Sequence, residues 1–312
     1  MSRRPDTFII GAPKSGTTSL HKYLALHPDI FMSQPKEPGY FARDVTGTHR
    51  RRLEYGDDEG RYLSLFAGAD GAKRAGEGST NYLMSRQAPD LIHDFNPDAR
   101  IIAMVRNPVE LVHSLHGQRI ANGIEPILDF ASAIDADDDR RAGRRLPPHV
   151  KGFGVAYRDN ALLGEQVERW LGTFGRDHVH VIVFDDFARQ TESSYASVLR
   201  FLGLDAKPRP ESFDVYNARH ETRPLLHAVY RSRMGRWIAR TALPATVGRG
   251  ATTRLRQLFG ARRVSRRQIE RPPLDSRVRR ELEREFAADV EKLGRLLDRD
   301  LAREWFGAAE AG

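Results

Sequence analysis

The chain has 312 residues, 40% hydrophobic and 29% charged, a composition typical of a globular protein with a sizeable core. It contains no cysteine, which excludes disulfide bonds, thiolate metal sites and a cysteine nucleophile. The apolar run that directly precedes Gly11 has only three residues, and no apolar run reaches about 18 residues. We therefore expect neither a signal peptide nor a membrane-spanning helix, and a cytoplasmic location.

The net charge of +8 is unevenly distributed along the chain. Residues 219–271 contain 14 arginines, no lysine and two acids, so this segment carries +12 and the remainder about −4. Three interpretations of the segment stay open. It attracts an anionic substrate, or it forms solvated helices. The third is contact with a membrane surface through 225–268, where apolar residues alternate with arginines. We do not expect nucleic-acid binding, because no motif of a nucleic-acid-binding fold is present.

Short apolar runs alternate with amphipathic stretches through the first two thirds of the chain. The expected strands cover 7–10, 30–33, 74–77, 100–105 and 178–184. The expected helices cover 17–26, 86–94, 108–121, 158–174 and 195–202. This alternation predicts an α/β fold with a parallel sheet covered on both faces.

The remaining segments have a different character. Residues 135–148 are charged and contain proline, which predicts a surface loop. Basic helical pieces are expected over 225–268, and a long amphipathic helix over 274–306. We expect a single domain over 1–312, with a core at about 7–218, a basic segment at 219–271 and a C-terminal helix at 272–306.

The strongest motif lies between the first expected strand and helix. Its sequence is Gly-Ala-Pro-Lys-Ser-Gly-Thr-Thr over 11–18, with the glycine spacing of a phosphate-binding loop. Backbone N–H groups and a helix N-terminus can hold one anion there. A nucleoside-triphosphate site should have lysine directly after the second glycine, but Thr17 stands there and the lysine is Lys14, inside the loop.

A second candidate anion site follows the strand at 100–105. Arg106 comes directly after that strand, and Ser114 lies eight residues later on the expected helix. Ligands in open α/β sheets bind at the carboxyl ends of the strands, and one arginine with one hydroxyl suits a phosphate monoester. Together the two motifs predict a ligand with two separate anionic groups.

These motifs resemble those of sulfotransferases that use 3′-phosphoadenosine 5′-phosphosulfate (PAPS). The run FIIGAPKSGTTSL is similar to their 5′-phosphosulfate loop, and Arg106-Asn107-Pro108 with Ser114 to their 3′-phosphate motif R-[DN]-P-x-x-R-x-x-S. Leu111 stands where that motif has its second arginine. The resemblance implies a P-loop-like three-layer sandwich with helices on both faces of the sheet. It implies that the 5′-phosphosulfate is bound by Lys14, Ser15, Gly16, Thr17 and Thr18, and the 3′-phosphate by Arg106 and Ser114.

The segment Lys36-Glu37-Pro38-Gly39-Tyr40-Phe41 is similar to heparan sulfate sulfotransferases and their bacterial relatives. The resemblance implies that Glu37 is the base that takes the acceptor proton, and that Lys36 helps to hold the sulfuryl group or the acceptor. A histidine, His113 or His116, is the lesser candidate. Residues 77–82 resemble the family's E-K-[ST]-P-x-Y segment, but with Gly78 for its lysine and Thr80 for its proline.

The expected activity is sulfuryl transfer from PAPS to a hydroxyl or amine of a carbohydrate, lipid or small molecule, with Lys14 stabilising the leaving phosphate and no metal required. Two alternatives stay open. A P-loop kinase for a small substrate would need ATP and Mg²⁺. A protein that binds anions without catalysis on the same fold would bind nucleotide without turnover.

Overall fold

The computed structural model describes residues 3–45, 58–147, 156–206, 210, 212–213 and 273–307. The chain divides into two compact units, one of Met1–Tyr216 with Pro273–Gly312 and one of Asn217–Pro272. All elements given below belong to the first unit. The arginine-rich segment 219–271, with the helical pieces and the membrane contact expected over 225–268, lies outside the described residues.

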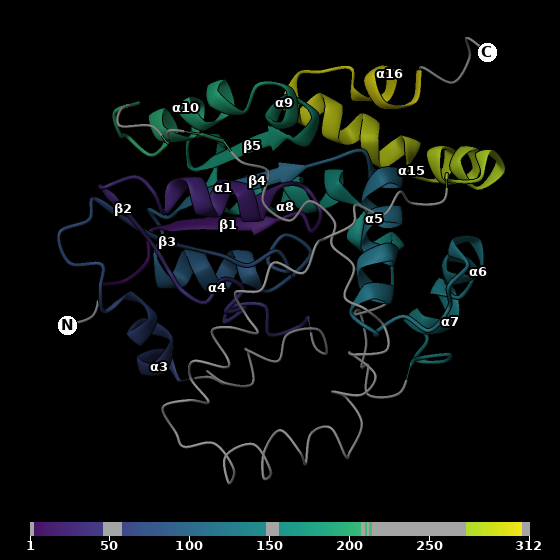
Figure 1. Cartoon of the computed structure of the whole chain (residues 1–312), viewed down its shortest axis with the longest axis horizontal. Coiled ribbons are helices and arrows are strands. Elements are labelled where there is room, and N and C mark those ends of the chain that lie inside the picture. The colour runs from purple at the N-terminus through teal and green to yellow at the C-terminus, as the bar shows by residue number, and fades with distance from the viewer. Residues whose placement is uncertain are drawn as a thin grey trace, which may run out of the picture. The chain divides into compact units, whose positions relative to one another are not determined.

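Strands and helices alternate along the first unit, as the sequence predicts (Figure 1). The strands are β1 (Thr7–Gly11), β2 (Ile30–Met32), β3 (Arg74–Gly78), β4 (Arg100–Val105) and β5 (Val179–Val183). The helices are α1 (Thr17–Leu24), α3 (Glu59–Leu63), α4 (Ala88–Phe95), α5 (Pro108–Ala121), α6 (Phe130–Asp135), α7 (Asp137–Arg141), α8 (Leu163–Phe174), α9 (Phe184–Arg189), α10 (Thr191–Phe201), α15 (Ser276–Leu297) and α16 (Leu301–Phe306). Among the helices of the described part, none has the length and apolar character needed to cross a bilayer.

The described strands form one sheet in the order β2-β3-β1-β4-β5, and every neighbouring pair is parallel. β1 is the central strand of this order. Its five residues are all buried, as expected of a parallel strand covered on both faces. Its register places Phe8 opposite Glu77 in β3 and opposite Ile101 in β4. The carboxyl ends of all five strands therefore meet at one edge of the sheet.

Two apolar layers enclose the sheet, because successive side chains of a strand point to opposite faces. Phe8, Ile10 and Ile101 belong to the layer that also contains residues of α4, α5, α8 and α15. Ile9, Ile102 and Met104 belong to the other layer, with residues of α1, α9 and α10. Helices cover both faces of the sheet (Figure 1), which confirms the expected three-layer α/β arrangement.

Two expectations from the sequence are wrong in detail. The segment expected to be a surface loop contains α7, in which Asp137 and Arg140 are buried. The single C-terminal helix expected over 274–306 is interrupted, because Asp298 adopts a left-handed conformation with φ 55° and Asp300 caps the separate helix α16 by accepting from the Arg303 N–H.

Candidate functional site

The loop between β1 and α1 has the backbone geometry of an anion cradle. Gly11, Lys14 and Gly16 have φ of 146°, 65° and 88°. A Cβ on Gly16 would lie 3.3 Å from Met104 Cε and from the Phe184 ring, and one on Gly11 would lie 2.7 Å from Leu83 Cβ. Gly11 is therefore required by close approach as well as by φ, whereas Gly16 is favoured chiefly by its φ.

The N-terminus of α1 faces the end of this loop. Gly16 is its N-cap, and no side chain caps the helix. The first backbone N–H groups of a helix have no intrahelical partner, and the helix dipole favours negative charge there. Ser15 and Thr17 are buried beside these groups, whereas Thr18 is partly exposed. This end of α1 can therefore hold a phosphate or phosphosulfate group.

Arg106 joins the second motif to this loop. Its Nη1 donates to the Lys14 carbonyl oxygen at 3.0 Å, and its guanidinium lies 4.7 Å from the centroid of the Phe184 ring. Glu110 lies one helical turn further, with a carboxylate oxygen 3.9 Å from Arg106 Nη2. The structure thus brings Arg106 and Lys14 together. Phe184, which also borders Gly16, is a site residue that the sequence reasoning missed.

The helix that follows Arg106 positions the other member of the second motif. Asn107 starts α5 by accepting from the N–H groups of Val109 and Glu110. Ser114 lies on this helix with 3% of its surface exposed, two turns after its start. Leu111, at the position of the family's second arginine, is fully buried in the core. An arginine there would place a charge among apolar side chains, which explains the departure from the motif.

Glu37 lies in the segment after β2 and is held by three kinds of contact. Its Oε2 accepts the Thr80 N–H at 2.8 Å and its two oxygens accept the Thr80 hydroxyl at 3.2–3.3 Å. Lys36 Nζ lies 2.5 Å from its Oε1. Its own N–H donates to the Gly78 carbonyl at 2.9 Å, with φ at 65°. The carboxylate is thus held by residues from the segments that follow β2 and β3.

Thr80 places this carboxylate beside the phosphate loop. The segment around it follows β1, because the Ser79 N–H donates to the Ile9 carbonyl and the Leu83 N–H to the Ile10 carbonyl. A Cβ on Gly11 would lie only 2.8 Å from the Thr80 carbonyl oxygen. The sequence reasoning counted Thr80 only as a departure from the family's proline. Proline has no backbone N–H, so replacing the family's proline by Thr80 adds a donor at this position. That difference could have identified Thr80 as a partner of the Glu37 carboxylate.

The buried carboxyl of Glu77 lies directly before this segment. Its Oε1 accepts from the hydroxyls of Tyr62 at 2.9 Å and Tyr82 at 2.7 Å, and its Oε2 from Ser79 at 2.6 Å. Burial raises the pKa of Glu77 to about 7, although the three hydrogen bonds oppose this shift.

His21 on α1 borders the same region and was not predicted from the sequence. A Cβ on Gly78 would lie 3.2 Å from His21 Cδ2 and 3.4 Å from Lys36 Cε, so these side chains fill the space that a side chain at position 78 would take. Burial, followed by the Lys36 ammonium, lowers the pKa of His21 to about 4. The ring is therefore neutral near pH 7, and its buried Nε2 has no hydrogen-bond partner within the described residues.

The lesser candidates have structural partners. His116 Nε2 contacts the Ile127 carbonyl oxygen at 2.9 Å, and both His113 and His116 pack against Phe130. Asp185, an acid after β5, accepts from the Trp305 indole at 3.0 Å, and the adjacent Asp186 pairs with Arg299 and Arg189. No cluster of three or more His, Cys, Asp or Glu side chains suited to a metal ion occurs within the ranges that the structure describes.

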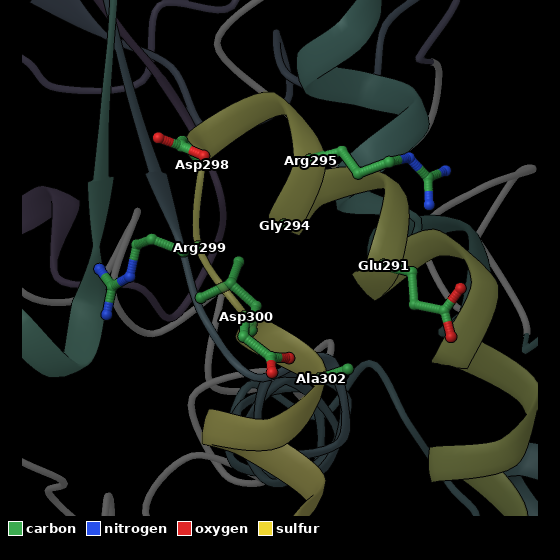
Figure 2. Close-up of a pocket in the computed structure, with 8 residues that line it drawn as sticks. Glu291, Gly294, Arg295, Asp298, Arg299, Asp300 and Ala302 are labelled. Carbon is green, nitrogen blue, oxygen red and sulfur yellow. The ribbon is translucent and has the colours of Figure 1, made fainter.

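A hollow of about 520 Å³ lies elsewhere, at the junction of α15 and α16 (Figure 2). Glu291, Gly294 and Arg295 line it from α15, and residues 298–302 from the turn into α16. Arg299 in its wall is already paired with Asp186 and Glu304. The hollow includes none of the predicted site residues and has no feature that points to a ligand.

Known proteins are similar to this chain in both sequence and fold. The profile of the sulfotransferase family matches residues 5–208. A sulfotransferase from Alicyclobacillus acidocaldarius has a crystal structure similar to this one, with a TM-score of 0.71 and 27% identity over 97% of this chain and 99% of that one.

Curated relatives are similar over part of their length. Human heparan sulfate glucosamine 3-O-sulfotransferase 6 is 26% identical over 65% of this chain and 53% of its own length. Mouse carbohydrate sulfotransferase 15 is 31% identical over 64% of this chain and 44% of its own length. The chain thus spans about half the length of these relatives. The family profile covers well over half of the chain and includes both anion motifs, and the protein therefore belongs to the sulfotransferase family.

Proposed function

We propose that the protein transfers a sulfuryl group from PAPS to a hydroxyl or amine acceptor. The observation that carries the proposal is the hydrogen bond from Arg106 to the Lys14 carbonyl, which joins the two anion motifs at one edge of the sheet. PAPS has two separate anionic groups, a 5′-phosphosulfate and a 3′-phosphate, and so requires two such motifs. Glu37, held by Thr80 next to Gly11, adds a carboxylate at the same edge.

The donor would be held by residues 14–18 at its 5′ end and by Arg106 and Ser114 at its 3′-phosphate. The uncapped N-terminus of α1 and the Gly16 cradle fit the first group, and the arginine after β4 fits the second. The cation–π contact with Phe184 helps to hold the Arg106 guanidinium at this position. ATP fits less well, because Thr17 stands where a triphosphate site has its lysine.

Bound PAPS supplies an activated sulfuryl group. Glu37 accepts the proton of the acceptor as the new bond from the acceptor to sulfur forms. The bond between sulfur and the bridging oxygen breaks, and Lys14 stabilises the negative charge that this oxygen keeps on the leaving 3′,5′-ADP. Lys36, whose ammonium is paired with Glu37, helps to hold the sulfuryl group or the acceptor.

We propose a carbohydrate as the acceptor class. Two observations support this. One is the Lys36-Glu37-Pro38 motif, and the other is that similar proteins include a heparan sulfate glucosamine 3-O-sulfotransferase and a carbohydrate sulfotransferase. A lipid or another small molecule is the alternative that an acceptor screen would reveal.

The test is transfer of radiolabelled sulfate from PAPS to a panel of unsulfated and N-sulfated glycosaminoglycan oligosaccharides, with hydroxylated lipids and phenols beside them. We expect labelled product and an equal amount of 3′,5′-ADP. Glu37→Gln should lose transfer and still bind 3′,5′-ADP, whereas the matched surface variant Glu168→Gln should retain both. Full transfer by Glu37→Gln, or transfer of phosphate from ATP to the same acceptors, would contradict the proposal.

A further inference from the structure

The segment that contains Glu37 is attached at several points to β3 and to the chain that follows it. The Ser33 and Glu37 N–H groups donate to the carbonyls of Gly76 and Gly78. Further along, the Gly39 N–H donates to the Ser79 hydroxyl at 2.9 Å, and the Phe41 N–H to the Tyr82 hydroxyl at 3.4 Å. Two of these four backbone hydrogen bonds therefore depend on side-chain hydroxyls.

One carboxylate orients both hydroxyls. Ser79 donates to Glu77 Oε2 at 2.6 Å and Tyr82 donates to Glu77 Oε1 at 2.7 Å, and Glu77 is fully buried. A hydroxyl has one hydrogen and two lone pairs. Because each hydrogen is directed at Glu77, the lone pairs remain for the N–H groups of Gly39 and Phe41.

We infer that Glu77 is a positioning residue for Glu37, acting through Ser79 and Tyr82 on the backbone of residues 37–41. The inference rests on the proposed role of Glu37 as base. Glu77 does not touch the reacting groups. It keeps the backbone that follows Glu37 fixed against β3 while Thr80 holds the carboxylate itself.

Tyr62 offers a matched control for this role. Its hydroxyl donates to the same Glu77 Oε1 at 2.9 Å, and it is as buried as Tyr82. Its ring stacks on Tyr40 at 4.3 Å, a contact that phenylalanine would keep. Tyr62→Phe and Tyr82→Phe each remove one hydrogen bond to Glu77, but only Tyr82→Phe also removes an acceptor for the N–H of Phe41.

The first experiment is backbone hydrogen exchange in the full chain, which needs no acceptor. We expect Ser79→Ala and Tyr82→Phe to speed exchange of Gly39 and Phe41 at least tenfold, with exchange in β4 unchanged. Tyr62→Phe should leave the segment unchanged. Equal effects of Tyr62→Phe and Tyr82→Phe, or no local effect of Ser79→Ala, would overturn the inference and leave Glu77 a general stabiliser of the fold.

The second experiment measures sulfate transfer and 3′,5′-ADP binding for the same variants beside Glu37→Gln. Ser79→Ala and Tyr82→Phe should lower kcat about tenfold while the Kd of 3′,5′-ADP changes less than twofold. If Glu37→Gln is inactive and Ser79→Ala fully active, the positioning role is wrong and the proposed base stands. If Glu37→Gln is fully active, the proposed base is wrong, whatever the exchange data show.

Discussion

Replacing Thr80 by proline removes the two donors that Thr80 directs at Glu37, with little disturbance of the backbone. Thr80 is the second residue of a β-turn in which the Tyr82 N–H donates to the Ser79 carbonyl at 3.1 Å. The φ angles of Thr80 and Asn81 are both negative, as in a type I turn, and proline is favoured at the second position of that turn. Thr80→Pro should therefore fold and lose both the N–H and the hydroxyl that contact Glu37.

The size of the effect follows from the lengths of these bonds. A hydrogen bond to a charged group contributes about 1.5–3 kcal/mol. The Thr80 N–H, at 2.8 Å, is the short bond, whereas the hydroxyl lies at 3.2–3.3 Å. If the N–H aligns Glu37 for proton transfer, its loss lowers kcat by roughly 10- to 150-fold. Thr80→Val keeps the N–H and the branched shape, so we expect a loss below about fivefold.

The assay is sulfate transfer from PAPS, with 3′,5′-ADP binding and thermal unfolding of each variant. We expect Thr80→Pro to keep the native affinity for 3′,5′-ADP, because the lost groups contact Glu37, the proposed base, and Thr80 belongs to neither anion motif. Full turnover by a folded Thr80→Pro variant would refute the reasoning. Equal losses in Thr80→Pro and Thr80→Val would assign the effect to the hydroxyl.

Three other variants test separate parts of the site. Arg106→Ala should weaken 3′,5′-ADP binding roughly 10- to 150-fold in calorimetry. It should weaken 5′-AMP binding far less, since only the first ligand has a 3′-phosphate and the variant otherwise loses only the bond to the Lys14 carbonyl and the contact with Phe184. Equal losses for the two ligands would contradict the assignment. Gly16→Ala forces a side chain to φ 88° and should lower stability by about 1–2 kcal/mol in thermal unfolding, so an unchanged Tm would count against the cradle. Burial raises the pKa of Glu77 from 4.5 to about 7, so the folded state binds more protons between these values. The unfolding free energy, measured by urea unfolding, should therefore fall as the pH rises through this window. Glu77→Gln should lack this dependence. Parallel curves of unfolding free energy against pH for the two proteins would show that the pKa is not raised.

The central strands were predictable because burial on both faces requires nearly continuous apolar runs. Phe8-Ile9-Ile10 and the run at 100–105 are such runs, and they form β1 and β4. The segment 135–148 misled the prediction because its charges indicate solvent. In the structure, Arg140 is paired with Glu125 and both side chains are buried. A charged side chain can be buried when a long-range partner neutralises it, and sequence spacing does not identify that partner.

The anion motifs were predictable because each depends on a local pattern at the end of a strand. The support around Glu37 was not, because it comes from another strand. Thr80 and Glu77 lie about 40 residues from Glu37, and only the pairing of β2 with β3 brings them to it. Phe184 was missed for the same reason, since it reaches Gly16 and Arg106 from the end of β5.

The most direct test of the central claim is calorimetric titration of the purified protein with 3′,5′-ADP, beside ATP with Mg²⁺. The two-anion site predicts micromolar binding of 3′,5′-ADP and much weaker binding of ATP. Tight binding of ATP with Mg²⁺ and no response to 3′,5′-ADP would contradict the account and favour a kinase.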